Sequence, residues 1–289
     1  MPDEKISVII PVFNKAAYSQ RCFKAIVQTA HRPLEVVVID NGSTDDTPAV
    51  LEAASRAAAD AGLEFQVIRN DSNLGACTSR NQGLEAATGQ FIVVMDNDIV
   101  IRQRSWAGEM SAILSGRPDV GIVCPRLLFA FPPYLVQCAG ASVSPTGRVD
   151  FIGRGQPAST PTLNHERELQ ACISACWMMP RKIVEELGGF DEIFNPVMFE
   201  DIDYSYCVRH AGHKILYTPT VEMYHFENVT TGMSPTLNST YLIVRNGMEF
   251  KKRWNFMFST ENGPTDDEYH WAEIEKVPLD CIAELDVID

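Results

Sequence analysis

Residues 91–98 read FIVVMDND, a run of five apolar residues followed at once by two carboxylates around an amide. A continuous apolar run without alternation is typical of a strand that is buried on both faces of a sheet. Before it, strand-like runs at residues 6–13, 34–39 and 64–68 alternate with segments of helical spacing at residues 16–30, 45–61 and 74–87. The alternation predicts an α/β fold with a parallel sheet and right-handed crossovers.

The acidic residues after this run lie where such a sheet binds its ligands, beyond the carboxyl ends of the strands. Side chains alternate along a strand, so Asp96 and Asp98 point the same way if the extended geometry continues. Two close carboxylates repel each other unless a cation lies near them, and oxygen ligands suit Mg²⁺ or Mn²⁺. His225 follows another predicted strand and could complete the site, although such a histidine is more often a plain surface residue.

Two further acidic positions have a functional and a plain interpretation. Asp40 ends the second predicted strand, where it could accept a hydrogen bond from the imino N–H of a base or simply stabilise the turn that follows. Asp201 follows Glu200 at the start of a predicted helix, where carboxylates also favour the helix dipole. In the functional interpretation Asp201 is a general base that takes the proton of an acceptor hydroxyl.

The rest of the chain is less regular. Residues 141–164 are rich in glycine, proline, serine and threonine, which predicts a hairpin followed by a mobile loop. Other elements are predicted as strands at 120–129, 169–179, 214–217 and 221–224 and as helices at 181–187 and 200–211. Residues 259–289 hold ten acidic residues and one lysine, so their net charge is 1 − 10 = −9. We expect a solvated tail or a small helix packed on the core, the alternative being an arm that docks a partner.

Composition excludes several classes of protein. The net charge of 24 − 38 = −14 is unsuited to nucleic acid, which needs a basic surface. The longest stretch without polar or charged side chains covers residues 127–136, half of the roughly 20 residues that a membrane span needs. The first residues lack the apolar core of a signal peptide. We therefore expect a cytoplasmic protein whose eight scattered cysteines are reduced thiols in the core.

Several segments together resemble the family 2 glycosyltransferases, which have the GT-A fold. They are ISVIIPVFN from residue 6, VVVIDNGSTDDT from 36, NLGACTSRNQGLEAATGQFIVVMDND from 73, GGFDEIFNPVMFEDIDYSYCVRHAGHKILYTP from 188, and His225. The resemblance covers about residues 5–250, in the family's order. It implies a GT-A domain at 1–250, with a Rossmann-like nucleotide-binding half to about residue 100, an acceptor half with a small mixed or antiparallel sheet, and a C-terminal extension at 251–289.

The resemblance also implies a role for each matched residue. Asp98 resembles the direct metal ligand, Asp96 shares the metal site and lies nearer the ribose, and His225 matches a third metal-contacting position. Asp201 resembles the catalytic base, and Glu200 beside it shapes the acceptor site. The nucleotide sugar is expected to contact Pro11, Asn14, Asp40, Arg80, Asn81, Asp96 and Asn97.

The reaction implied by the resemblance moves a sugar from a nucleoside-diphosphate sugar to the hydroxyl of a saccharide, a lipid-linked sugar or another acceptor. Uridine or thymidine diphosphate is favoured as the leaving group, Mn²⁺ or Mg²⁺ neutralises its charge, and one displacement inverts the anomeric carbon. The run FKKRWNFMF at residues 250–258 mixes cations and aromatic rings. We expect it to pack on the core as a helix, with peripheral contact with the inner face of a membrane as the alternative, against which the neighbouring acidic tail argues.

Other interpretations are weaker. A sugar-nucleotide pyrophosphorylase has a glycine-rich loop after its first strand, where this chain reads PVFNK at residues 11–15. A dinucleotide oxidoreductase is disfavoured because no G-x-G-x-x-G follows that strand. A processive synthase needs Q-x-x-R-W, whereas residues 250–254 read FKKRW. A catalytically silent relative that serves as a binding subunit of a glycan-assembly complex stays open, although the complete set of acidic residues and His225 argues against it.

Overall fold

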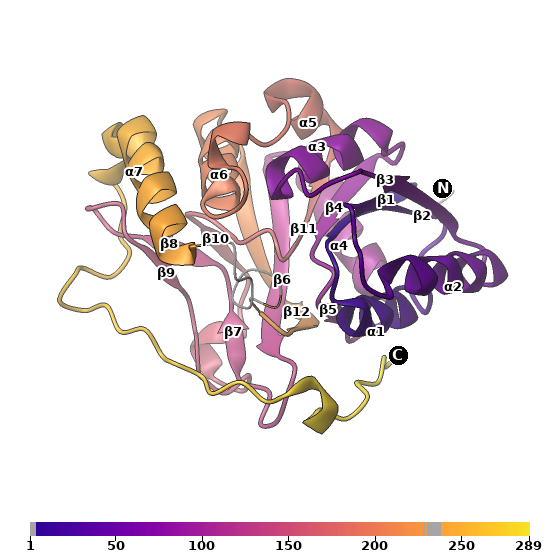
Figure 1. The fold of residues 1–289 in the computed structure, drawn as a ribbon. Helices are drawn as coiled ribbons and strands as arrows, with labels where there is room; N and C mark the ends of the chain where they lie inside the picture. Colours follow the sequence, from indigo (N-terminus) through magenta and orange to yellow (C-terminus); the bar gives the residue numbers. More distant parts are fainter. Residues whose placement is uncertain (1–3, 228, 230–237) are drawn as a thin grey trace.

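The computed structural model describes residues 4–227, 229 and 238–289. A mixed sheet runs through the molecule, with helices on both of its faces (Figure 1). Across the sheet the strands follow the order β10 (Arg167–Leu169), β12 (Lys214–His225), β6 (Val120–Phe129), β11 (Cys176–Pro180), β4 (Phe91–Met95), β1 (Ile6–Val12), β2 (Leu34–Asp40) and β3 (Glu64–Arg69). Two short strands pair off this path, β5 (Ile99–Ile101) with β12 and β7 (Val136–Cys138) with β6. The predicted α/β class is confirmed.

Strands β1 to β4 form the parallel part of the sheet, as predicted. Strand β1 lies between β2 and β4 and pairs in parallel with both, and β3 continues the parallel order beyond β2. Helices α1 (Ala16–Ile26) and α2 (Thr47–Asp60) lie on one side of these strands and α3 (Ala76–Ala86) on the other (Figure 1). The helix predicted at 16–30 ends four residues early, because the chain turns there: the N–H groups of Gln28 and Thr29 donate to the carbonyls of Ala25 and Ile26, three residues back, instead of four.

The other half of the sheet is mixed. Strand β11 runs antiparallel to β4 and β6, whereas β12 is parallel to β6. The prediction of a single strand at 169–179 is wrong, since β10 and β11 are separate strands that pair with different neighbours. The two strands predicted at 214–217 and 221–224 are one strand, β12, with a register shift between Thr218 and Glu222. Pro219 lies in that shift, and a proline cannot donate to a strand ladder, which made the run look interrupted.

The remaining predicted elements are mostly confirmed. Strands β8 (Ala141–Val143) and β9 (Val149–Phe151) form the predicted hairpin, while the mobility of the loop after it stays a prediction. Helices α5 (Arg181–Leu187) and α6 (Glu200–His210) match their predicted positions, and short 3-10 turns occur at Pro161–Leu163, Glu192–Phe194 and Leu279–Cys281. Helix α4 (Trp106–Gly116) is additional to the predicted elements, and α7 (Ser239–Phe258) contains the helix expected to pack on the core at 250–258 but begins eleven residues before it.

Helix α7 crosses residue 250, where the sequence analysis placed the start of a C-terminal extension. Its inner face is aromatic: the rings of Phe250, Trp254 and Phe258 lie 5.0–6.1 Å from the ring of Tyr206 on α6, between centroids. This packing fixes α7 against the helix that begins with Glu200 and Asp201. Among the helices that the structure describes, none has the length and apolar character needed to cross a bilayer.

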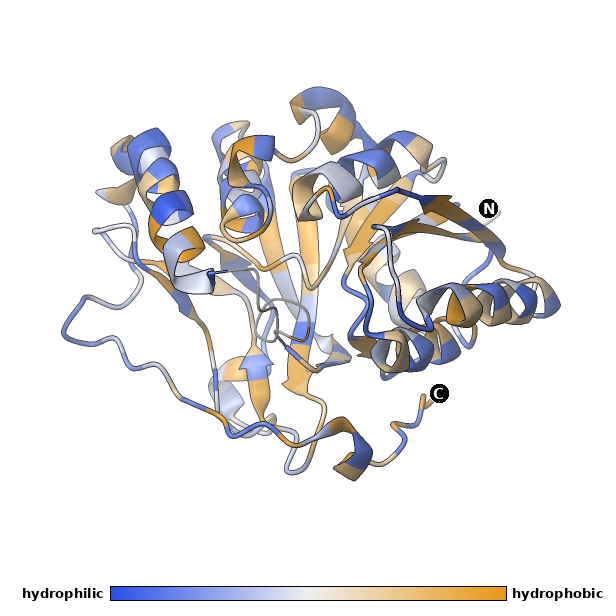
Figure 2. Cartoon of the chain, viewed as in Figure 1, coloured by the Kyte–Doolittle hydropathy of each residue, from blue (hydrophilic) through white to orange (hydrophobic). Residues whose placement is uncertain are grey.

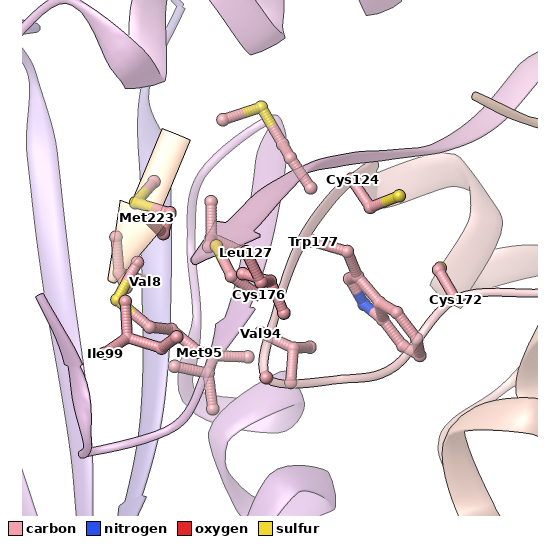
Figure 3. Packing of buried hydrophobic residues seen from close by; sticks show 14 of the residues in the cluster. Val8, Val94, Met95, Ile99, Cys124, Leu127, Cys172, Cys176, Trp177 and Met223 are labelled. Carbon is pink, nitrogen blue, oxygen red and sulfur yellow. The ribbon is translucent and has the colours of Figure 1, made fainter. Parts of the chain in front are cut away.

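Apolar side chains fill the space between the sheet and its helices, and the outward turns of the helices are hydrophilic (Figure 2). Six of the eight cysteines are buried, as expected, while Cys207 is half-buried and Cys281 is exposed. Four of the buried thiols line one small space beside Leu127 and Trp177 (Figure 3): Cys124, Cys138, Cys172 and Cys176. Burial raises the pKa of the Cys138, Cys172 and Cys176 thiols, so these three stay protonated core residues.

The acidic tail is neither a free segment nor a packed helix over most of its length. It runs as an extended chain beneath β9 and β7 and ends beside β5 (Figure 1), where the N–H of Ile288 donates to the carbonyl of Arg102 (2.7 Å). Its acidic side chains pair with basic ones of the domain, in the pairs Glu261–Arg209, Asp266–Arg148, Glu284–Lys24 and Asp289–Arg104. The negative charge of the tail is therefore partly matched by the body of the protein.

Candidate active site

Asp96, Asp98 and His225 come together at one edge of the sheet, where β4 and β12 end and β11 begins. The N–H of Asp96 donates to the carbonyl of Ala175 (2.9 Å), so the segment after β4 leaves beside the loop that enters β11. Strand β5 then folds back against β12, with Ile99 opposite His225. This unpredicted pairing is the reason that His225, distant in sequence, lies next to Asp98.

Asp96, Asp98 and His225 form the one cluster of candidate metal ligands found in the described part of the chain, and one ligand atom of each lies within 4.8 Å of the others. His225 Nε2 is 3.2 Å from Asp98 Oδ1, and His225 Nδ1 is 2.8 Å from Gln137 Oε1. Two carboxylates and an imidazole whose second nitrogen is held by a neighbour suit Mn²⁺ or Mg²⁺. The residues present therefore fit a divalent cation.

The charges of the cluster are consistent with a cation. Burial raises the pKa of Asp96, and the Asp98 carboxylate raises it further, although Arg80 lowers it. Burial alone would lower the pKa of His225, but the Asp98 carboxylate outweighs this effect and raises it. Both shifts report an excess of negative charge in a buried place, which a bound cation would offset.

Arg80, on α3, joins this cluster to the start of α6. Its Nη2 donates to Asp96 Oδ1 (2.9 Å) and its Nη1 to Glu200 Oε1 (2.6 Å). The residue is 3% exposed, and its guanidinium lies 5.6 Å from the centre of the Phe190 ring. Arg80 Nε and Glu200 Oε2 are buried without a hydrogen-bond partner among the described residues. Arg80 thus positions two acidic side chains, while its contact with a diphosphate stays a prediction.

Asp201 is held by backbone N–H groups in the first turn of α6. Its Oδ1 accepts from the N–H of Ile202 (2.8 Å), and its Oδ2 accepts from the N–H of Ser174 in the loop before β11 (3.2 Å). Burial, and then the carboxylate of Glu200, raise the pKa of Asp201 to about 7, although Arg80 and the two N–H groups lower it. A carboxylate with this pKa is a stronger base than an exposed aspartate, whose pKa is about 3.9.

Comparison with known proteins shows the family of this chain. The profile of the family described as Glycosyl transferase family 2 matches residues 7–188, which include β1 to β4, the D-x-D motif at residues 96–98 and β11. The chain belongs to glycosyl transferase family 2. The family predicted from the sequence is thereby confirmed.

One curated relative of this family 2 chain is the O-antigen biosynthesis protein RfbC of Myxococcus xanthus. It is 29% identical over 287 residues, which cover 96% of this chain and 21% of that protein. The chain spans only about a fifth to two fifths of the length of the first curated relatives that it matches.

Solved structures share the fold of this family 2 chain at low identity. The mannosyltransferase PcManGT from Pyrobaculum calidifontis, in complex with GDP-Man and Mn²⁺, has a TM-score of 0.61 at 18% identity, over 90% of this chain and 66% of that one. GalNAc-T7 with UDP, GalNAc and Mn²⁺ has a TM-score of 0.68 at 18% identity, over 87% of this chain and 48% of that one. The predicted GT-A fold is confirmed by both.

The nucleotide side of this family 2 chain lies at the ends of β1 and β2. Asp40 is 1% exposed, and its carboxylate accepts from Arg69 Nη1 (2.8 Å) and the N–H of Ser43 (2.9 Å). Asn14 has a left-handed backbone with φ 56°, and its Oδ1 accepts from the N–H of Thr44 (2.8 Å), which fixes the turn after β2. Pro11 is half-buried within β1. Contact of Asp40, Asn14 and Pro11 with a nucleotide stays a prediction.

Two predicted amides are engaged with the protein itself. Asn81 Nδ2 donates to the carbonyl of Phe190 (2.9 Å), and its Oδ1 accepts from the N–H of the same residue (2.8 Å). Asn97 Nδ2 donates to Ser19 Oγ (2.8 Å) on α1. Both contacts brace the loops around the site, so a direct role of either amide in binding the sugar nucleotide rests on the resemblance alone.

Several residues that build the site had no role assigned from the sequence: Arg245-Asn246 was noted only as resembling an RN pair of the family, and Gln137 and Ser174 were not singled out. Asn246, which is fully buried on α7, donates from Nδ2 to the carbonyls of Phe194, Val197 and Met198 at 2.8–3.0 Å. It thereby fixes the loop that leads into Glu200 and Asp201. Gln137 and Ser174 contribute through contacts between distant segments, for which a single sequence carries no signal.

Proposed function

We propose that this chain transfers a sugar from a nucleoside-diphosphate sugar to an acceptor hydroxyl by a single displacement with inversion. The observation that supports this most is the metal-ligand cluster of Asp96, Asp98 and His225, which Arg80 joins to Glu200, the neighbour of Asp201 in sequence. Arg80 connects the two sets of acidic residues through its bonds to Asp96 and Glu200.

In this proposal Asp201 is the general base. Its carboxylate, oriented by the N–H groups of Ser174 and Ile202, takes the proton of the acceptor hydroxyl as that oxygen bonds to the anomeric carbon. The bond between the anomeric carbon and the diphosphate oxygen breaks in the same step, so the nucleoside diphosphate leaves with the bonding electrons. Glu200, fixed by Arg80, shapes the acceptor side and raises the pKa of Asp201.

Asp96, Asp98 and His225 would hold the divalent cation, Mn²⁺ or Mg²⁺. When bound there, such an ion stabilises the negative charge of the diphosphate. The PcManGT and GalNAc-T7 structures both contain Mn²⁺, one with GDP-Man and the other with UDP. We favour uridine or thymidine diphosphate as the leaving group of this chain and treat guanosine diphosphate as the competitor.

The acceptor is proposed as a saccharide, a lipid-linked sugar or another hydroxyl compound, and the name of RfbC favours the assembly of a polysaccharide. Peripheral membrane contact also stays a proposal. On the outer face of α7 the exposed side chains of Tyr241, Val244 and Met248 precede Lys251 and Lys252, a composition that suits an anionic lipid surface. Sedimentation with anionic vesicles tests it: recovery of all the protein in the supernatant would contradict the contact.

A thermal-shift panel tests the proposed function. UDP, dTDP, GDP and CMP are each added with Mn²⁺, with Mg²⁺ or with EDTA, since a ligand that binds only the folded state raises the melting temperature. We expect one nucleoside diphosphate to stabilise the chain only when a metal is present. If none of them shifts the melting temperature under any condition, the proposal loses its donor site, and the silent-subunit interpretation gains weight.

The pKa of Asp201 predicts the pH dependence of the reaction. Only the ionised carboxylate accepts a proton, and it is ionised above a pKa of about 7. We therefore expect log kcat/KM to rise by about one per pH unit in the acidic range and to level off above about pH 7. Initial rates in buffers of constant ionic strength measure this profile. A rate that stays constant down to pH 5 would contradict Asp201 as the base.

A further inference from the structure

The third metal-ligand candidate is held by a buried polar chain behind it. His225 Nδ1 lies 2.8 Å from Gln137 Oε1, and Gln137 Nε2 lies 2.9 Å from Glu227 Oε1. Arg154 closes the chain, with its Nη1 2.7 Å from Glu227 Oε1 and its Nη2 3.1 Å from Glu227 Oε2. The side chains of His225, Arg154 and Glu227 are 7–9% exposed and Gln137 is 1% exposed, so water competes little for these bonds.

The chemistry of each partner fixes the direction of this chain. The Glu227 carboxylate is paired with Arg154 and can only accept, so the amide nitrogen of Gln137 must face it. The amide oxygen of Gln137 then faces His225, and because that oxygen can only accept, the proton of the imidazole lies on Nδ1. Nε2 faces Asp98 Oδ1 at 3.2 Å, which also can only accept, so the two acceptors compete for the ring protons in the metal-free chain, and a cation beside Asp98 would take the place of a proton on Nε2.

The C-terminal segment covers the outer end of the same chain. The Arg154 guanidinium lies 4.0 Å from the centre of the Trp271 ring, and Arg154 Nε donates to the carbonyl of Ala272 (3.0 Å). Lys276 Nζ donates to the carbonyl of Glu227 (2.5 Å). Residues 271–276 thereby fix both the guanidinium and the backbone at the end of β12. This tail, which has no place in the mechanism above, thus touches the support of a metal ligand.

We propose that Arg154, Glu227 and Gln137 form a relay of positioning residues that sets the tautomer and orientation of His225 for the metal, and that residues 271–276 of the C-terminal segment complete it. The inference rests on the metal site of the proposed function. It makes the tail part of the active site rather than an arm for a partner. Loss of a support of this kind lowers metal affinity by about 10- to 100-fold.

The first test compares Mn²⁺ affinities, measured from the signal of free Mn²⁺ in electron paramagnetic resonance. Gln137→Met keeps the size of the side chain and removes both polar atoms, and we expect Mn²⁺ to bind about 10- to 100-fold more weakly. Gln170→Met is the matched control, because Gln170 also donates to a buried glutamate, Glu261, but lies outside the relay. Equal losses in the two variants, or none in Gln137→Met, would overturn the proposal.

The tail has its own matched pair. The Arg154 guanidinium of the relay lies over the Trp271 ring, whereas the Arg148 guanidinium lies 4.7 Å from the centre of the Tyr269 ring, and Tyr269 has no hydrogen bond or cation–π contact with the relay among the described residues. We expect Trp271→Ala to weaken Mn²⁺ binding in the same direction as Gln137→Met, by a smaller factor, and Tyr269→Ala to leave it unchanged. Identical affinities of the two variants would remove the tail from the proposal.

A second readout needs no metal and separates failure of the relay from failure of the metal site. Long-range ¹H–¹⁵N spectra of histidine-labelled protein, at a pH where the imidazoles are neutral, report which nitrogen of each ring carries the proton. We expect Nδ1 of His225 to carry a proton in spite of the Asp98 carboxylate beside Nε2, with the signal assigned by its loss in His225→Gln, and a shift toward Nε2–H in Gln137→Met. An unchanged tautomer would overturn the relay. If the wild-type chain shows the Nδ1–H tautomer but binds no Mn²⁺, it is the metal site of the proposed function that fails.

Discussion

Replacement of Asp201 by asparagine should reduce the rate of sugar transfer by about 10²- to 10⁴-fold while leaving donor binding within about twofold of the wild type. This is the usual contribution of a general base, and it corresponds to about 3–5.5 kcal/mol of the activation barrier. Asparagine keeps the size of the side chain but has no lone pair basic enough to accept the proton. Rates are measured at saturating donor and acceptor, and donor affinity by calorimetry.

A control on the same helix separates catalysis from folding. Asp203 accepts from Arg253 Nη1 (2.8 Å) and from Trp254 Nε1 (2.7 Å), which tie α6 to α7, and it has no contact with the proposed reacting groups. We expect Asp203→Asn to lower the melting temperature more than Asp201→Asn does while it retains most of the activity. Wild-type turnover in Asp201→Asn would show that another group removes the proton.

The parallel half of the fold was predictable because its signals are local. The apolar runs that became β1, β2 and β4 are buried on both faces, and such runs show in the sequence without knowledge of their neighbours. The rule that ligands lie beyond the carboxyl ends of parallel strands then placed Asp40, Asp96 and Asp98 at one edge. The predicted helix starts lie within two residues of the observed ones, whereas the end of α1 was placed four residues too late, since fraying and capping are decided by contacts of a few residues.

The mixed half was harder to predict because its signals are tertiary. Strand β5 has three residues, too few for a periodic pattern, yet its pairing with β12 is what brings His225 to Asp98. Arg80 was assigned to a diphosphate from its motif, but its burial and its bonds to Asp96 and Glu200 depend on how α3 and α6 approach each other. The acidic tail has many charged residues but no periodic pattern from which an element can be predicted, and its course depends on basic residues spread over the domain.

Replacement of Asp98 by asparagine should abolish the metal-dependent part of nucleotide binding. Asp98 lies 3.2 Å from His225 Nε2 and shares the cluster with Asp96, so its loss removes one charged ligand of three. At a ligand concentration about 100 times the dissociation constant, binding stabilises the wild type by about 2.7 kcal/mol. A 100-fold weaker affinity leaves about 0.4 kcal/mol of this by the same relation. For a domain of this size the melting shift should fall from about 5–10 °C to about 1 °C.

The design of this experiment makes the metal the only variable. Each variant is melted with the nucleoside diphosphate in the presence of Mn²⁺ and again with EDTA, and the difference between the two shifts is compared. Asp119→Asn, at an exposed carboxylate paired with Lys214, changes the net charge by the same amount and should retain the wild-type difference. If Asp98→Asn also retained it, the ion would have to be held without the D-x-D. The cluster of Asp96, Asp98 and His225 would then be a charge network within the fold rather than the place where the donor's diphosphate is neutralised.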